Sequence, residues 1–227
     1  MIEYNKSLPL FSLHVYKCGG TSFNRLLKLW FHFGFFKHYY DNVNVKAPNR
    51  VSDWILNQKL LPICIHGHFN PLKNIGVHDF YPNAQQYITF LRNPLEAHIS
   101  AYNYLRETSD KGTFYWEGQK RTFNMEIDEF IETKNLNYLI WLPFNFTELN
   151  FKEIIDSNFI HIGITEEYEK SVKIIAKKLN RPYIKFKRLN VSNKVNQKPS
   201  ESSIRIFNEK YSLENKIFNY ARLLNCN

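Results

Sequence analysis

The chain has 227 residues, of which 44% are hydrophobic and 16% aromatic, so a single domain spanning residues 1–227 is expected to bury its own core. Its 30 lysines and arginines outnumber 21 acidic residues, and the net charge of +9 favours an anionic partner such as a nucleotide, nucleic acid, acidic glycan or membrane surface. The three cysteines, Cys18, Cys64 and Cys226, are too few for a disulfide framework, so free thiols and a reducing compartment are expected.

The apolar segments do not predict export or membrane insertion. Residues 1–16 lack the basic segment that precedes the apolar stretch of a signal peptide. The other apolar segments, 26–36 and 159–164, are too short or too interrupted to span a bilayer. The sequence therefore predicts a soluble protein without a transmembrane segment.

Apolar runs alternate with amphipathic segments along the chain. Strands are predicted at residues 10–16, 61–66, 86–92, 159–164 and 182–186. Helices are predicted at residues 21–33, 93–108, 125–133, 148–157 and 166–179, and one broken helix or two consecutive helices at 201–224. Residues 109–122 mix glycine, charged and aromatic residues without a period, which indicates a surface loop near the site. The alternation predicts a three-layer α/β fold with a mostly parallel central sheet, whose ligand binds beyond the carboxyl ends of the strands.

The first predicted strand and helix are joined by a glycine-containing turn, Lys17-Cys18-Gly19-Gly20-Thr21-Ser22. Paired glycines let backbone N–H groups face an anion, and the helix N-terminus adds a favourable partial charge. The turn therefore predicts a P-loop-like phosphate-binding loop, with a plain structural turn as the alternative. It is not a Walker A motif, because the lysine precedes the glycines.

Cys18 lies at a predicted helix N-terminus, where the pKa of a thiol can fall enough to make it a nucleophile. A tyrosine-phosphatase loop has an arginine six positions after its cysteine, but Asn24 stands there in this chain. We therefore expect the Cys18 side chain to have a packing role.

A second anion site is predicted where the third strand meets its helix. Asn93 as N-cap, Pro94 at the first position and Glu96 in a capping box mark the start of that helix. Arg92 precedes it, and a guanidinium there can bind a phosphate through two hydrogen bonds. Ser100, about two turns into the helix, can supply another donor, although each residue alone also fits a solvated surface position.

Segments 14–22 and 90–102 together resemble the sulfotransferases that use 3′-phosphoadenosine 5′-phosphosulfate (PAPS), especially the carbohydrate branch that includes heparan sulfate 2-O-sulfotransferases. The resemblance implies the sulfotransferase fold and an enzyme that transfers a sulfuryl group from PAPS to a hydroxyl of a glycan acceptor. It implies that the loop from Lys17 to Ser22 holds the 5′-phosphosulfate. It also implies that Arg92 and Ser100 hold the 3′-phosphate.

The second predicted strand ends in His66-Gly67-His68, which is similar to the segment with the proposed catalytic histidine in the 2-O-sulfotransferase branch. By position His68 matches that base, and His66 is the reserve candidate. A neutral imidazole near pH 7 can accept the proton of an attacking hydroxyl, while Lys17 stabilises charge on the bridging oxygen. Cys64, His66 and His68 occupy alternate positions of a predicted strand, an arrangement that could bind a metal ion. No fourth ligand has suitable spacing, however, so no metal is expected.

A polar, basic loop follows the last predicted strand. Its residues Asn190, Ser192 and Lys194 lie where the relatives have a loop that closes over the nucleotide. The resemblance therefore implies that they contact the donor, and a plain surface loop is the alternative.

Two other classes of protein remain open. A basic nucleic-acid or glycan binding module could use Tyr39, Tyr40 and the aromatic residues 114–116, but no RNA-recognition, zinc-finger or coiled-coil pattern accompanies them, so no nucleic-acid partner is expected. A P-loop-type nucleotide kinase would need a Mg²⁺-binding carboxylate near a strand end, and none is evident. Without a membrane anchor we expect a cytoplasmic enzyme of a prokaryote or virus, or a Golgi-lumen enzyme if the chain is a trimmed piece.

Overall fold

The computed structural model describes residues 1–58, 60–116, 118–185 and 197–226. Within these residues a central sheet is formed by β1 (Leu10–Leu13), β2 (Phe35–His38), β3 (Cys64–Gly67), β4 (Tyr87–Leu91) and β7 (Phe159–Ile164). The strands lie in the order β2-β3-β1-β4-β7, and each neighbouring pair is parallel. All five are short and buried or half-buried apart from Lys37, as expected for a parallel sheet that is covered on both faces.

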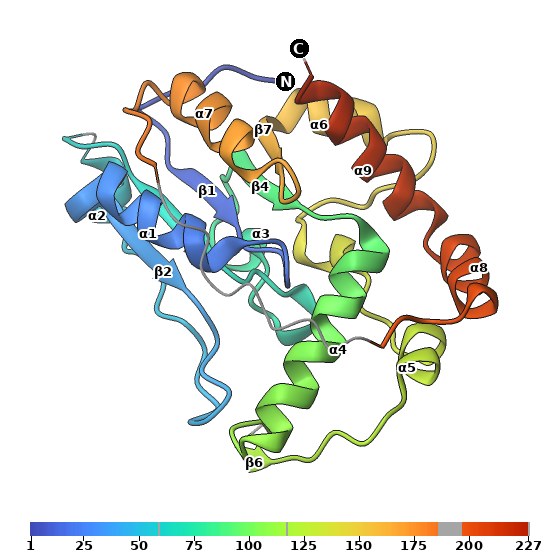
Figure 1. Ribbon diagram of the computed structural model, residues 1–227. Helices are drawn as coiled ribbons and strands as arrows, with labels where there is room; N and C mark the ends of the chain where they lie inside the picture. The colour runs from blue at the N-terminus through green and yellow to red at the C-terminus, as the bar shows by residue number, and fades with distance from the viewer. Residues whose placement is uncertain (59, 117, 186–196, 227) are drawn as a thin grey trace.

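One face of the sheet is covered by α1 (Gly20–Phe31) and α7 (Tyr168–Lys178), as Figure 1 shows. Their aromatic side chains meet on Phe90 of β4: the ring of Phe23 lies 4.9 Å from that of Phe90, and the ring of Tyr168 lies 5.0 Å from it. These contacts place both helices against the centre of the sheet.

The opposite face packs against α3 (Val77–Phe80) and the chain around it, and α6 (Phe151–Asn158) lies beside β7. Phe11 of β1 contacts Tyr81, which directly follows α3, with ring centroids 5.2 Å apart. Phe144 contacts Tyr87 of β4 at 5.3 Å on the same face. With helices on both faces, the predicted three-layer α/β fold with a parallel sheet is confirmed.

The strand order determines where a ligand can bind. From β1 the chain continues to β2 and β3 on one side, whereas β4 and β7 lie on the other side of β1. The carboxyl ends of β1 and β4 are therefore neighbours at the point where the order reverses. Open α/β sheets bind their ligands in the crevice at such a point.

A second hydrophobic cluster lies among α4 (Pro94–Asp110), α5 (Ile127–Thr133) and α8 (Glu201–Lys210), next to α9 (Ser212–Leu224). Its buried members are Ala101, Tyr102, Ile127, Phe130, Ile131, Phe207 and Tyr211. This packing holds α4, which begins two residues after Arg92, against the rest of the molecule. The predicted helical segment 201–224 is two consecutive helices, separated at Tyr211.

Several short elements differ from the expectations. Residues 109–122 are not a plain loop: α4 extends to Asp110, and β5 (Tyr115–Trp116) and β6 (Gln119–Lys120) form an antiparallel hairpin. The unpredicted elements are α2 (Asp53–Asn57), η1 (His32–Gly34), η2 (Pro71–Lys73) and η3 (Tyr138–Trp141), besides β2 and α3. Each is too short to produce a clear period in the sequence.

The strand predicted at residues 182–186 is wrong over its described part, because residues 182–185 belong to no strand. Pro182 has no backbone N–H to donate to a neighbouring strand. Its carbonyl oxygen instead accepts a hydrogen bond from Nε1 of Trp30 at 2.9 Å, which holds the segment against α1. Among the described residues, no helix combines the length and the apolar character that crossing a membrane requires.

Candidate active site

The predicted phosphate loop connects β1 to α1 through two residues with left-handed backbone, Lys17 at φ 61° and Gly19 at φ 82°. Gly19 is the N-cap of α1, and a side chain at this φ would be strained. The turn places the N-terminus of α1 at the carboxyl end of the sheet. The first N–H groups of an α-helix have no acceptor within the helix, so this end of α1 can bind an anion.

A single buried hydroxyl joins this loop to the ends of β4 and β7. Oγ1 of Thr165, which directly follows β7, lies 3.0 Å from the carbonyl oxygen of Cys18 and 2.9 Å from that of Leu91. The Thr165 N–H donates to the same Leu91 oxygen at 2.8 Å. A threonine after a strand belongs to no motif, so sequence reasoning does not find Thr165.

Lys17 extends from the loop toward α4. Its Nζ lies 4.2 Å from the ring centroid of Tyr104 and 5.8 Å from that of Tyr16. Burial and, to a lesser extent, the positive charge of Arg92 together lower the pKa of Lys17 to about 8, while Glu107 opposes the shift. Lys17 and Arg92 are thus close enough to repel each other, which an anion between them would relieve.

Arg92 is mostly buried where β4 ends, with Nη2 3.5 Å from Oε2 of Glu96. Asn93 is the predicted N-cap of α4, since its Oδ1 accepts from the Glu96 N–H at 3.2 Å. A capping box also needs the Glu96 carboxylate to accept from the Asn93 N–H, and this part of the prediction is wrong. The Asn93 N–H donates instead to Oε1 of Glu166 at 2.9 Å. The Glu96 carboxylate is left to face Arg92.

The remaining predicted donor residues differ in accessibility. Ser100 is buried on α4, on the same helical face as Tyr104, which lies one turn further on and contacts Lys17. Thr21 is exposed in the first turn of α1, whereas Ser22 is buried. Asn190, Ser192 and Lys194 lie outside the described residues.

Cys18 packs in the core below the loop. Burial raises the pKa of its thiol to about 12, which overrides the favourable effect of Arg92. Its backbone N–H already donates to the carbonyl oxygen of Val15 at 3.2 Å. In this conformation Cys18 shapes the loop and offers a ligand neither a thiolate nor a free N–H.

The two predicted base candidates differ in how they are enclosed. His66 is 1% exposed, with Nδ1 2.9 Å from Oγ of Ser12, and burial lowers its pKa to about 3. His68 is half-buried, and its Nδ1 donates to the carbonyl oxygen of His14 at 2.6 Å. Because a carbonyl only accepts, the lone pair of neutral His68 is on Nε2.

Aromatic rings surround His68. Its centroid lies 4.2 Å from that of His14, and the rings of Tyr39 and Trp141 each lie 5.1 Å away. Burial lowers the pKa of His68 to about 4, so the ring is neutral near pH 7. The sequence indicates Tyr39 only for the alternative of a binding module, and it assigns His14, the first residue of the segment 14–22, no role of its own. The signal that could reveal His14 is its spacing from Ser12, which places it on the sheet face shared with His66.

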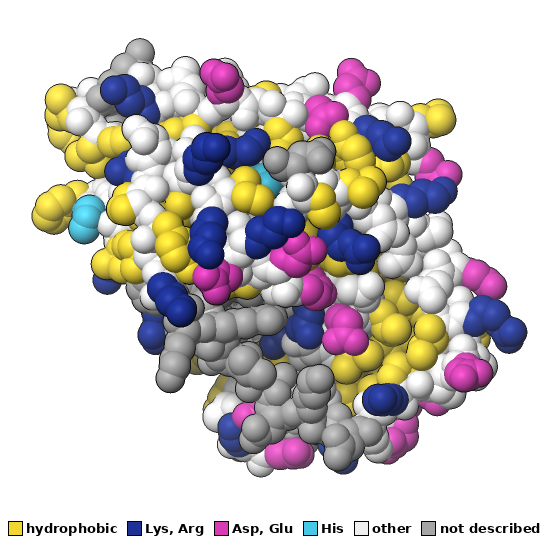
Figure 2. Space-filling view, turned by 45° about the horizontal axis from the view of Figure 1, so that its top comes forward, with side chains coloured by type: hydrophobic (Ala, Val, Ile, Leu, Met, Phe, Trp, Pro, Cys, Tyr) yellow, Lys and Arg dark blue, Asp and Glu magenta, His cyan; other side chains and the backbone are white. Residues whose placement is uncertain are grey.

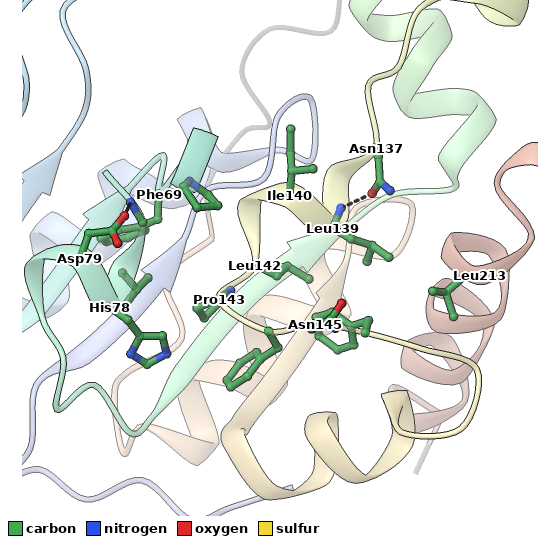
Figure 3. Close-up of a pocket in the computed structure, with 15 residues that line it drawn as sticks. Phe69, His78, Asp79, Asn137, Leu139, Ile140, Leu142, Pro143, Asn145 and Leu213 are labelled. Carbon is green, nitrogen blue, oxygen red and sulfur yellow. Dashed lines mark hydrogen bonds between the residues drawn. The ribbon is translucent and has the colours of Figure 1, made fainter. Parts of the chain in front are cut away.

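A pocket of about 510 Å³ lies beside this cluster, on the sheet face opposite α1 and α7. Figure 3 shows Phe69, His78 and Asp79 at one side and Leu213 at the other side. Between them lie Leu139, Ile140, Leu142 and Pro143. None of Lys17, Arg92 and His68 lines it. In the part of the chain that the structure describes, no three His, Cys, Asp or Glu residues are arranged to hold a metal ion.

Comparisons with known proteins give little direct guidance. No family model and no curated protein matches the chain. Among solved structures, the chain is similar to mouse sulfotransferase SULT7A1 complexed with PAP, at 12% sequence identity and a TM-score of 0.48. The similarity covers 80% of this chain and 61% of that chain, so this chain spans less than two thirds of the mouse protein.

The cysteines provide a test of the enclosed loop. In native protein at pH 8, iodoacetamide should alkylate the exposed Cys226 but neither Cys18 nor Cys64, because the thiolate is the reactive form and burial raises the pKa of both core thiols. Peptide mass spectrometry measures the labelling of each site, and urea-denatured protein, in which all three should react, is the control. Native labelling of Cys18 as fast as Cys226 would show that the loop is open.

Proposed function

We propose that the chain is a sulfotransferase that transfers a sulfuryl group from PAPS to a hydroxyl of a carbohydrate acceptor. The observation that carries this proposal is the pair of cationic side chains at the reversal of strand order, Lys17 after β1 and Arg92 after β4. A nucleotide with an anionic group at each end would satisfy both cations. PAPS has such groups, the 5′-phosphosulfate and the 3′-phosphate.

The two ends of the donor have different requirements. The N-terminus of α1, with Gly19 and Gly20, suits the 5′-phosphosulfate because its N–H groups can donate to several oxygens. Arg92 suits the 3′-phosphate, which would replace Glu96 as its partner. The Arg92–Glu96 pair is long at 3.5 Å and the carboxylate is largely exposed, so the exchange costs little. Ser100 lies on the helix that follows Arg92 and would add a donor.

The transfer would use His68 as the base. The acceptor oxygen attacks sulfur while Nε2 of His68 takes the hydroxyl proton, and the bond between sulfur and the bridging phosphate oxygen breaks. The electron pair of that bond leaves with 3′-phosphoadenosine 5′-phosphate (PAP), and the Lys17 ammonium stabilises the negative charge. His68 is preferred to His66 because its side chain is less buried. The hydrogen bond from its Nδ1 to the His14 carbonyl also leaves the lone pair on Nε2, which points away from that carbonyl.

A carbohydrate acceptor is supported by the rings beside His68. Trp141 and Tyr39 offer flat apolar surfaces, against which the C–H faces of a sugar ring can pack while its hydroxyls reach the base. The net charge of +9 favours an acidic glycan. On the face that Figure 2 shows, however, Lys and Arg side chains are interspersed with Asp and Glu. Two such ion pairs, Lys170–Glu167 and Lys173–Glu169, lie on and next to α7. That face is not the unbroken basic surface typical of a nucleic-acid binding module.

One observation favours a second candidate, a nucleotide kinase. Glu166 places a carboxylate at the carboxyl end of β7, beside the loop, where a kinase would need a Mg²⁺ ligand. Its Oε1 accepts a hydrogen bond from the Asn93 N–H, which argues for a structural role.

Calorimetric titration with PAP, and separately with ATP and Mg²⁺, distinguishes the two candidate functions by the nucleotide that binds. Tighter binding of PAP supports the sulfotransferase, and preference for ATP with Mg²⁺ would reverse the assignment.

Two variants should separate donor binding from proton transfer. His68→Ala should lower kcat about 100-fold or more with little change in PAP affinity, since a general base contributes about 10² to 10⁴. Arg92→Ala should weaken PAP binding about 10- to 100-fold, because a charged hydrogen-bonded partner of the phosphate is lost. Calorimetry gives the affinities, and transfer of labelled sulfate from PAPS to glycans gives the rates. Full turnover by His68→Ala would refute its role as the base.

The affinity for PAP should also depend on pH through Lys17. Its pKa of about 8 means that the ammonium is charged below that pH and neutral above it, so binding should weaken as the pH rises from about 8 to 9.5. The phosphates of PAP are fully ionised over this range, since their second pKa is about 6. Lys17→Met should weaken binding and flatten the pH profile. Lys28→Met, an exposed change on α1, is the matched control and should keep the wild-type profile.

A further inference from the structure

We propose that His14 is a positioning residue that couples the geometry of the phosphate loop to the orientation of His68. This inference rests on the proposed function. His14 is the first residue after β1 and precedes Lys17 by three positions, and its backbone continues the pairing between β1 and β3. Its N–H donates to the carbonyl oxygen of Gly67 at 2.8 Å, and its own carbonyl oxygen accepts from Nδ1 of His68 at 2.6 Å.

The His14 ring lies between two other imidazoles. It stacks on His68 with centroids 4.2 Å apart and planes 20° apart, and on His66 with centroids 5.3 Å apart and planes 13° apart. His68 is therefore held by His14 twice, through the backbone carbonyl and through the face of the ring. A change in the position of the His14 ring must change the environment of His68.

The edge of the same ring lies against the phosphate loop. A Cβ on Gly20 would lie 1.9 Å from Cδ2 of His14 and 2.1 Å from its Nε2, which is far inside van der Waals contact. Gly20 is the first residue of α1 and part of the loop proposed to hold the 5′-phosphosulfate. A glycine is therefore required here because any side chain would collide with the His14 imidazole. This requirement is separate from the access that a bound anion needs to the loop N–H groups. The loop therefore contacts the edge of the His14 ring, and His68 stacks on its face.

Tyr39 fixes the rotation of this ring. Its hydroxyl oxygen lies 2.8 Å from Nδ1 of His14 and also interacts with the Asn24 side chain on α1. Burial, followed by the repulsion that protonated His68 and His66 and the Lys17 ammonium would exert, holds the pKa of His14 well below its usual value. A neutral ring can stack on neutral His68 without repulsion. His14 is thus held in one orientation from three sides, as a positioning role requires.

The test is a double-mutant cycle with Gly20→Ala, His14→Ala and the variant that carries both changes. Gly20→Ala should lower PAP affinity about 10-fold or more, because its Cβ displaces either the ring or the loop. Adding His14→Ala should restore most of that affinity, since the space of the ring is then free. His14→Ala alone should lower kcat about 10-fold or more while PAP affinity stays within about 3-fold of wild type. Lys28→Ala, on the exposed side of α1, is the matched control.

A measurement without ligand tests the coupling between the loop and His68 independently of the proposed activity. In long-range ¹H–¹⁵N spectra of the imidazoles, Gly20→Ala should shift the signals of His14 and His68 but not that of His161, which is hydrogen-bonded to Asn225 at the end of α9. Such shifts in a protein that does not bind PAP would support the coupling and refute the sulfotransferase. Additive effects in the cycle, or unchanged His68 signals in folded Gly20→Ala protein, would overturn the role of His14. If Gly20→Ala does not fold, wild-type kcat in His14→Ala overturns it instead.

Discussion

The arrangement of the site depends on the Thr165 hydroxyl, which joins the loop after β1 to the ends of β4 and β7. It lies within hydrogen-bonding distance of the carbonyl oxygens of Cys18 in the loop and Leu91 at the end of β4, and Thr165 itself directly follows β7. In a fully buried position, loss of this hydroxyl would leave the Cys18 carbonyl without that partner, at a cost of about 1–3 kcal/mol. These two contacts of Thr165 keep the predicted phosphate loop beside the start of α4. Lys17 in the loop is thereby held near Arg92.

The strand order then divides the chemistry around β1. On the β4 side, the loop, Lys17 and Arg92 form the cationic half of the site. On the β3 side lie the neutral imidazoles of His66 and His68. The end of β1 belongs to both halves, because the His14 ring contacts Gly20 with its edge and stacks on His68 with its face. A single strand end therefore connects the proposed donor site and the proposed base.

Sequence reasoning predicts what depends on local pattern. The strand at 159–164 and the N-cap Asn93 are confirmed, and so is the loop between the first strand and helix, because each has a signal within a few residues. Contacts that depend on the register between strands cannot be predicted in this way. The spacing of His14 from Ser12 indicates a sheet face but not the residues that His14 contacts, and no local pattern indicates the contacts of Thr165. Glu166 likewise takes the Asn93 N–H that the local pattern assigns to Glu96, since the helix start lies beside the end of β7. The strand predicted at 182–186 is wrong in its described part because Pro182 packs on Trp30 instead of pairing.

In the proposed binding mode, two cationic positions, Lys17 and Arg92, bind the two anionic ends of one nucleotide. A crystal structure of the protein with PAP tests it most directly. We predict that the 5′-phosphate lies within hydrogen-bonding distance of the N–H groups at Gly19 and Gly20 and of Nζ of Lys17, with the 3′-phosphate on the guanidinium of Arg92. A nucleotide bound with either phosphate away from these groups, or in the pocket lined by Phe69 and Leu213, would contradict the account.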